Sequence, residues 1–291
     1  MIDLAVIGDV GGHSALLAAM IRDLGGDPEL GTLPETTVVV QVGDLITQDK
    51  NRGPDSDGCV AIADRMLRCS NRNWLQLWGN HDMAAIGGPR RPAWGAQRRI
   101  AAETTATLMR WWRDKVALRA VCADFGEHSV LICHAGLTVG SWTDLERPDA
   151  MAAARLLNGE AWPSNPNRVR PGMLVTEMTD EHADVSWAEV VHELYEPWHR
   201  FGLTEGPIPF SQIHGHASPW NWNTDEFWPG TPDWMKQACS VNAINRTTLT
   251  SLGRLADGAD ALAQSVDWSL LESAPQMPWP VTSFRIHSLG T

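Results

Sequence analysis

The sequence predicts an α/β fold, and three patterns support this prediction. Short apolar runs that end at glycine alternate with segments of helical periodicity in the first part of the chain. Two further strand-like runs, separated by a glycine, then indicate antiparallel pairing. The ends of these runs carry aspartate, asparagine and histidine, and ligands of open α/β sheets bind at such strand ends. We expect residues 1–291 to form one domain that carries a substantial insertion.

The first half of the predicted fold is an alternation of strands and helices. Its strands are short, apolar and rich in β-branched residues, and each ends close to a glycine. Its helices repeat apolar residues at a spacing of three and four. The predicted elements are a strand at Leu4–Ile7, a helix at Ser14–Leu24, a strand at Val38–Val42, a helix at Gly58–Cys69 and a strand at Trp74–Trp78.

The second half departs from this alternation. A helix is predicted first, followed by a hairpin and two late strands. These elements are Gln97–Lys115, the pair Val116–Phe125 and Ser129–Cys133 across Gly126, and the strands Ile208–Ile213 and Leu249–Leu252. Residues 141–209 are rich in Trp and Pro and contain two weakly helical stretches, Ala150–Leu157 and Val185–Tyr195. We interpret this segment as an inserted lid or subdomain.

The composition argues against several classes of partner. Asp and Glu number 35 against 23 Lys and Arg, and the formal net charge of −12 argues against a broad nucleic-acid-binding surface. An anionic substrate then needs a local positive charge, which bound metal ions can supply. The five cysteines form no CxxC pair and favour a reducing compartment. With neither a basic leader nor a long apolar run in the sequence, we expect a cytoplasmic protein without a membrane segment.

Metal-ligand side chains stand at the predicted strand ends. Any one of them has a common structural role, such as a helix cap, but the ordered set is hard to explain structurally. Oxygen and imidazole ligands of this kind suit manganese, with iron or zinc as alternatives. A carboxylate that bridges two ions brings them close enough to act together, and Asp44 is the candidate bridge. The candidates are Asp9, His13, Asp44, Asn80, His81, Asp82, His134, His214 and His216.

Five short motifs carry these residues. They are Gly8-Asp9-Val10-Gly11-Gly12-His13, Gly43-Asp44-Leu45, Gly79-Asn80-His81-Asp82, Cys133-His134-Ala135-Gly136-Leu137 and Gly215-His216-Ala217. In this order and at strand ends, they resemble the motifs of the calcineurin-like metallophosphoesterase superfamily. The fourth motif is most similar to the branch that holds phosphoprotein phosphatases and bacterial dinucleoside tetraphosphatases. The resemblance implies a four-layer α/β/β/α sandwich, in which two mixed sheets are flanked by helices and the metal ions lie at the mouth.

The resemblance also implies how two divalent ions are bound. Asp9 would bind the first ion and Asp44 would bridge both, while the second ion would be held by Asn80, His134 and His216.

The first metal site departs from the family pattern at two positions. Gly11 stands where the family usually has a histidine, and Ser218 stands where its last motif has a second histidine. His13 or His214 is therefore the candidate that completes the first site.

Catalytic and substrate-binding residues are expected next to the metal ions. By the resemblance, His81 would lie outside both metal shells, where an imidazole can protonate the departing alkoxide, and Asp82 would orient it. The arginines that clamp phosphate in the protein phosphatase branch are missing from their usual positions. Arg52, Arg90 or Arg91 is the candidate replacement, because a guanidinium group binds two phosphate oxygens from any suitable position.

The expected reaction is hydrolysis of a phosphomonoester by a metal-bridging hydroxide. The substrate would be a phosphoserine or phosphothreonine protein or a phosphorylated small molecule. Two alternatives stay open: a dinucleoside polyphosphate hydrolase or phosphodiesterase, and a non-catalytic scaffold with an impaired metal site. The oligomeric state is not predicted.

Overall fold

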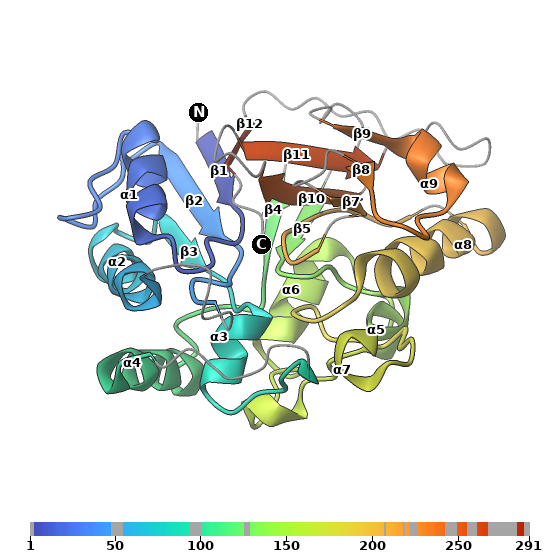
Figure 1. Ribbon diagram of the computed structural model, residues 1–291, viewed down its shortest axis with the longest axis horizontal. Helices are drawn as coiled ribbons and strands as arrows, with labels where there is room; N and C mark the ends of the chain where they lie inside the picture. The colour runs from blue at the N-terminus through green and yellow to red at the C-terminus, as the bar shows by residue number, and fades with distance from the viewer. Residues whose placement is uncertain are drawn as a thin grey trace.

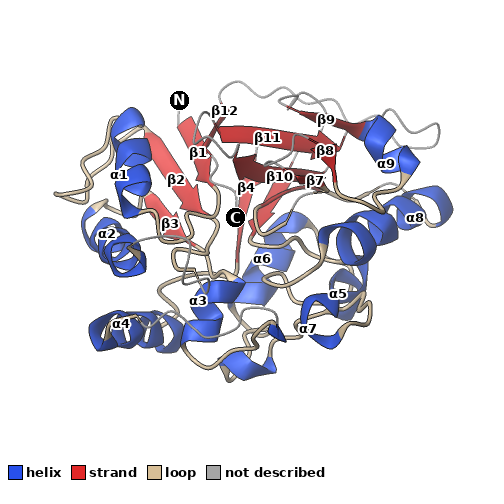
Figure 2. Ribbon diagram, viewed as in Figure 1, coloured by secondary structure: helices blue, strands red, loops and turns tan. Residues whose placement is uncertain are grey.

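The computed structural model has a mixed α/β fold built around two main β-sheets (Figure 1). It describes residues 3–47, 55–92, 100–124, 129–206, 208–217, 219–221, 226–241, 249–254, 261–266 and 284–287. In Figure 2, α1, α2 and α4 lie at the left and α5, α7 and α8 at the lower right, with the strands between and above them.

The first sheet contains the three strands predicted from the start of the sequence. Its strand order is β12-β1-β2-β3, and every neighbouring pair is parallel. The strands are β1 (Asp3–Ile7), β2 (Thr37–Gln41), β3 (Trp74–Gln76) and β12 (Phe284–His287). Parallel pairing brings the carboxyl ends of β1, β2 and β3 to the same edge of the sheet.

The second sheet is mixed and contains the predicted hairpin. Its order is β4-β5-β6-β10-β11-β9; β5, β6 and β10 are parallel, and the other neighbouring pairs are antiparallel. Strand β6 begins later than predicted and β10 ends later. The strands are β4 (Ala120–Asp124), β5 (Ser129–Cys133), β6 (Ser211–His214), β9 (Cys239–Val241), β10 (Leu249–Arg254) and β11 (Ala261–Val266). A separate antiparallel pair consists of β7 (Trp220–Asn221) and β8 (Glu226–Phe227).

The helices fall into two groups along the chain. The first is α1 (Ser14–Asp23), α2 (Ser56–Cys69), the short α3 (Asn80–Ala85) and α4 (Ala102–Arg113). The second is α5 (Val139–Asp144), α6 (Ala150–Asn158), α7 (Met173–Thr176), α8 (Glu196–Thr204) and α9 (Asp233–Ala238), with a 3-10 turn at Pro166–Arg168 and a π-helical turn at Val190–Tyr195. Among the described residues, no helix has the length and apolar character needed to cross a membrane.

Successive strand residues point to opposite faces, and this alternation separates the core into layers. Ile7 of β1 packs in a cluster with residues of α1, α2 and α4, whereas its neighbour Val6 packs in a cluster shared with the second sheet. In β5, Ile132 belongs to that shared cluster and Leu131 packs with residues of α6 and α8. Ile7 and Leu131 therefore pack against helices, whereas Val6 and Ile132 pack in a cluster that both sheets share.

The insertion over residues 141–209 packs on the outer face of the second sheet. Its helices α5, α6 and α8 share an apolar cluster with strand residues such as Leu131, whereas Leu174 of α7 packs against the cluster of the first sheet. Arg119, directly before β4, forms a buried ion pair with Asp184 of the insertion and donates a 2.8 Å hydrogen bond to the carbonyl of Ala161. The insertion is thus tied to the sheet by both apolar packing and charge.

One helix prediction in the insertion is wrong at its start. The prediction placed a helix over Val185–Tyr195, but the helical turn begins at Val190 and continues into α8. The carboxylate of Glu189 accepts hydrogen bonds from the amides of Val191 and His192, at 3.0 and 2.7 Å. This capping satisfies amides that have no partner inside the helix, so the helix starts there.

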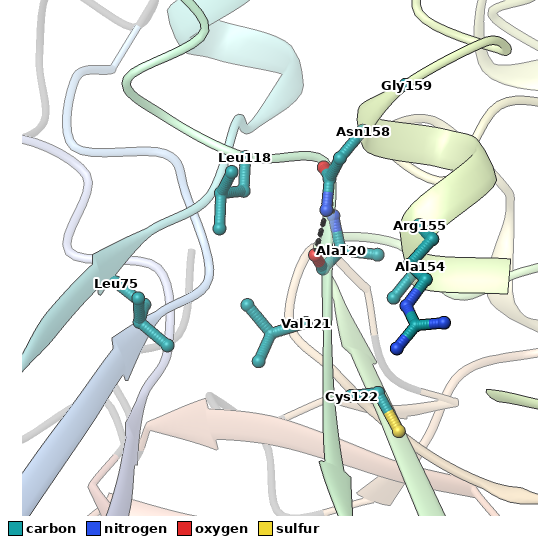
Figure 3. A pocket seen from close by; sticks show the side chains of 9 residues that line it. All are labelled: Leu75, Leu118, Ala120, Val121, Cys122, Ala154, Arg155, Asn158 and Gly159. Carbon is teal, nitrogen blue, oxygen red and sulfur yellow. Dashed lines mark hydrogen bonds between the residues drawn. The ribbon is translucent and has the colours of Figure 1, made fainter. Parts of the chain in front are cut away.

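A groove of about 420 Å³ lies where the edge strands of both sheets meet α6. Figure 3 shows its wall, in which the amide of Asn158 donates to the carbonyl of Ala120 at 2.7 Å. Most of the side chains along it are apolar. The lining residues are Leu75, Leu118, Ala120, Val121, Cys122, Ala154, Arg155, Asn158 and Gly159, and none of them is a predicted metal ligand.

The packing of the two sheets predicts the cost of a cavity between them. Ile132 is fully buried in the layer that both sheets share, so Ile132→Ala should lower the free energy of unfolding by about 2–5 kcal/mol. The control is Leu30→Ala, because Leu30 is 65% exposed and its truncation should cost no more than about 0.5 kcal/mol. Urea unfolding of the two variants measures both values. Equal losses would contradict the packing described.

Candidate metal centre

Five of the predicted metal ligands follow strands of both sheets. Asp9 comes after β1, Asp44 after β2, Asn80 at the start of α3, His134 after β5 and His216 after β6. The first four are at most 4% exposed. His216 is partly exposed as a residue, although its Nε2 atom is buried. Glycine or a short turn after each strand lets these side chains approach one another.

The structure brings these five side chains together. Asp44, His134 and His216 each offer one ligand atom, and these atoms lie within 4.8 Å of one another. His134 Nε2 lies 3.6 Å from Asp44 Oδ1 and 3.1 Å from Asn80 Oδ1. Asp9 Oδ1 lies 3.7 Å from His134 Nδ1. The oxygens of Asp44 and Asn80 and the Nε2 of His134 are close enough to share a cation, and Asp9 lies beside them.

The hydrogen bonds around the cluster leave its lone pairs unused. His134 Nδ1 donates to the carbonyl of Val42 at 2.9 Å, so its Nε2 carries a lone pair that faces the oxygen of Asn80. Asp9 Oδ1 and His216 Nε2 are buried and have no hydrogen-bond partner among the described residues. Buried polar atoms without partners are rare, and bound cations would satisfy these atoms. The donor set therefore fits a divalent metal ion.

Burial also governs the charges of the cluster. It raises the pKa of Asp9 and the pKa of Asp44 well above the usual range, and neighbouring aspartate charges raise both further. It lowers the pKa of His134 well below its usual range, and it lowers the pKa of His216 to about 3. The two imidazoles are therefore neutral near pH 7, which is the form that binds metal, whereas the two carboxylates need a proton or a cation beside them.

His81 and Asp82 both contact the loop of Asp44. The His81 amide donates to Asp44 Oδ1 at 2.9 Å, and its Nε2 lies 3.7 Å from Asp44 Oδ2. The Asp82 carboxylate accepts from the amides of Asp44, Ile46 and Gly79 at 2.8, 3.2 and 3.2 Å. Asp82 thus fixes the loop that carries Asp44 and caps α3. Its predicted role in orienting His81 stays a prediction.

Two glycines allow the backbone to approach the carboxylates. A Cβ atom at Gly79 would lie 2.1 Å from Asp44 Oδ1, and one at Gly215 would lie 2.2 Å from Asp9 Oδ1. Both distances are far below van der Waals contact, so a side chain at either position would displace a carboxylate. These glycines of the third and fifth motifs are therefore needed for the geometry of the cluster.

The other predicted site residues that the structure describes lie outside the group of metal-ligand atoms. His13 precedes α1 and is partly exposed, outside the Asp44, His134 and His216 group. The His214 ring is buried and bonded to Tyr195. Arg90 and Arg91 are exposed after α3, and the charge of Arg91 contributes to lowering the pKa of His81, after the larger effect of burial. Arg52 lies outside the described residues.

Two residues near the cluster were missed by the sequence reasoning, and both come from the insertion. Trp187 packs edge-on against the His216 ring with centroids 6.5 Å apart. The Tyr195 hydroxyl lies 3.1 Å from His214 Nε2. The sequence offered one signal, since Tyr195 is the only tyrosine of the chain.

The raised pKa values of Asp9 and Asp44 predict that metal binding releases protons. Below these raised values the carboxylates hold protons that a cation must displace, whereas the neutral imidazoles release none. Manganese affinity should therefore rise with pH, and proton release should fall as the pH rises. Calorimetry in buffers of different ionisation enthalpy measures the number of protons. Binding at pH 6 without proton release would contradict this assignment.

No protein-family model matches this chain, and no curated protein matches it significantly. The resemblance to metallophosphoesterases therefore remains a prediction from the five motifs.

Proposed function

We propose that this protein is a metal-dependent phosphoesterase of the calcineurin-like type that hydrolyses phosphomonoesters. The observation that carries the proposal is the convergence of Asp9, Asp44, Asn80, His134 and His216, with lone pairs that no hydrogen bond uses. The packing of helices and two sheets supports the four-layer sandwich that the motifs imply. The free cysteines among the described residues support a cytoplasmic location.

The proposed cofactor is a pair of divalent ions, with Mn²⁺ favoured over Fe or Zn²⁺. Carboxylate, amide and imidazole donors in one cluster suit these metals. Asp44 lies near both histidines of the cluster and is the proposed bridge, Asp9 serves the first ion, and the second is held by Asn80, His134 and His216. When bound, the ions lower the pKa of water toward neutrality and neutralise the charge of the phosphate.

His81 is the proposed proton donor to the leaving oxygen. Its side chain is 16% exposed, so it borders the cluster and remains accessible to a substrate. Burial first, and then the charge of Arg91, lower the pKa of His81 to about 3 in the ligand-free protein. A bound phosphate beside the ring has the opposite effect, because a negative charge favours the imidazolium form. Proton donation by His81 therefore depends on the bound substrate.

Arg91 is the proposed phosphate-binding arginine. Its charge acts on His81 and also on His216, so Arg91 lies close to the cluster. No such effect of Arg90 appears among the causes of these shifts, although both side chains are exposed. A guanidinium group at this position can hold the phosphate oxygens that the metal ions do not contact.

The first test separates metal binding from proton transfer. Asp44→Asn should remove both Mn²⁺ binding and phosphatase activity, because the proposed bridge loses its charge. His81→Ala should keep Mn²⁺ bound but lower kcat by about 10²–10⁴-fold, the usual contribution of a general acid. Mn²⁺ titration measures metal binding, and hydrolysis of an alkyl phosphate such as glycerol phosphate, whose alkoxide needs a proton as it leaves, measures kcat.

The control for both variants is Asp23→Asn, which removes an exposed aspartate at the end of α1 and should change neither quantity. Full turnover by Asp44→Asn would contradict the assignment of Asp44 as a metal ligand. A bound-metal protein that hydrolyses bis-p-nitrophenyl phosphate faster than p-nitrophenyl phosphate would favour the phosphodiesterase alternative instead.

The second test compares two neighbouring arginines. Arg91→Ala should raise KM for phosphomonoesters by about tenfold, because one charge-assisted contact to phosphate is lost. Arg90→Ala is the matched control and should leave KM unchanged. Steady-state kinetics with Mn²⁺ present measures both, and equal effects of the two substitutions would contradict the role of Arg91.

A further inference from the structure

The single tyrosine of the chain belongs to the insertion and contacts the strand that precedes the proposed metal-binding loop. Tyr195 is fully buried and ends the π-helical turn Val190–Tyr195. Its hydroxyl lies 3.1 Å from His214 Nε2, and the two rings meet edge to face with centroids 5.7 Å apart. This contact joins the insertion to the end of β6, two residues before His216.

Both ring nitrogens of His214 form hydrogen bonds. Its Nδ1 lies 2.9 Å from the carbonyl oxygen of Gly215 and donates to it. In the neutral ring, Nε2 is then the acceptor, and the Tyr195 hydroxyl donates to it. The two hydrogen bonds fix the orientation of the ring and connect it to the backbone of the next residue. His214 thus acts as a link between Tyr195 and the loop of His216.

The loop of His216 needs such support because its backbone is strained. His216 has φ of +62°, a left-handed conformation that is unfavourable for a non-glycine residue. Its amide donates to Asp9 Oδ2 at 2.9 Å, and the amide of Gly215 donates to the carbonyl of His134 at 2.9 Å. These bonds hold the loop on the side of the cluster. The bond between His214 and Tyr195 holds it on the side of the insertion.

Tyr195 is itself held firmly in the insertion. Glu193, in the same helical turn, is fully buried. Its carboxylate accepts hydrogen bonds from the amides of Met173, Asp180 and Glu189, at 2.7, 2.7 and 2.8 Å. Two other segments of the insertion, at Met173 and Asp180, therefore converge on this turn. Helices of the π type are uncommon and often occur next to functional sites.

We propose that Tyr195 is a positioning residue, through which the insertion sets the placement of the metal ligand His216. The hydroxyl orients His214, and the His214 ring fixes the carbonyl of Gly215 and hence the strained backbone of His216. This inference rests on the proposed metal-dependent function and adds a role for the insertion in it. Loss of the hydroxyl should weaken metal binding without unfolding the protein.

The single tyrosine offers a direct probe of this coupling. Protein labelled with 3-fluorotyrosine should give one ¹⁹F resonance, which reports on Tyr195 alone. Saturation with Zn²⁺, which is diamagnetic, should shift this resonance, because a ligated His216 changes the loop that Tyr195 contacts. A resonance that stays in place while Zn²⁺ binds would overturn the proposal.

A pair of hydroxyl deletions tests the same idea by affinity. Tyr195→Phe should lower Zn²⁺ affinity by about tenfold, the usual effect of losing a group that orients a ligand. Ser141→Ala also deletes one hydroxyl of the insertion, which donates to the carbonyl of Ala183 at 3.0 Å, and should leave Zn²⁺ affinity unchanged. Thermal unfolding of the metal-free variants verifies that both remain folded.

The outcomes separate this inference from the function on which it rests. Wild-type affinity in Tyr195→Phe would overturn the positioning role but leave the metal centre standing. Equal weakening in both variants would show a general effect of the insertion and would also overturn it. Absence of Zn²⁺ binding by the wild-type protein would overturn the proposed function together with this inference.

Discussion

The site depends on one electrostatic constraint, which is the burial of several carboxylates at adjoining strand ends. Two like charges about 4 Å apart repel by about 4 kcal/mol at an effective dielectric constant of 20. At Asp82, hydrogen bonds from backbone amides offset part of this constraint, although burial still raises the pKa of Asp82 to about 7. Asp9 and Asp44 each accept a hydrogen bond from one backbone amide, that of His216 and that of His81, and both carboxylates lie beside the neutral imidazole of His134. A divalent cation between them would remove the repulsion and use the imidazole lone pairs, which is why the arrangement is best explained as a metal centre.

Some of the backbone strain of the protein lies in the same cluster. Asp44 and His216 both adopt positive φ, at 53° and 62°, and both belong to the cluster that could hold a metal ion. Strain of this kind persists only where surrounding contacts hold it. The Asp82 carboxylate accepts a hydrogen bond from the amide of Asp44, and the Asp9 carboxylate accepts one from the amide of His216. These contacts therefore fix the candidate ligands in place in the metal-free protein.

The sequence predicted the parts of the fold that have local signatures. Short apolar runs located β1, β2 and β5, and the motifs after these strands located the side chains of the cluster. Contacts between distant segments could not be predicted in this way. The bond between Tyr195 and His214 has no periodicity or motif, and the start of the helix at Val190 depends on the cap from Glu189. The role of Gly11 also needed the structure: with φ of +49°, its amide donates to the carbonyl of Asp44 at 2.7 Å, so a glycine at this position supports the loop of the proposed bridge.

The central claim is that two cations are held where the strand ends of both sheets meet. Anomalous diffraction from crystals grown with Mn²⁺ tests it most directly. The account predicts two peaks at this place, beside the side chains of the cluster that includes Asp44, His134 and His216. A map without peaks at this place under metal-replete conditions, or with peaks only elsewhere, would contradict it.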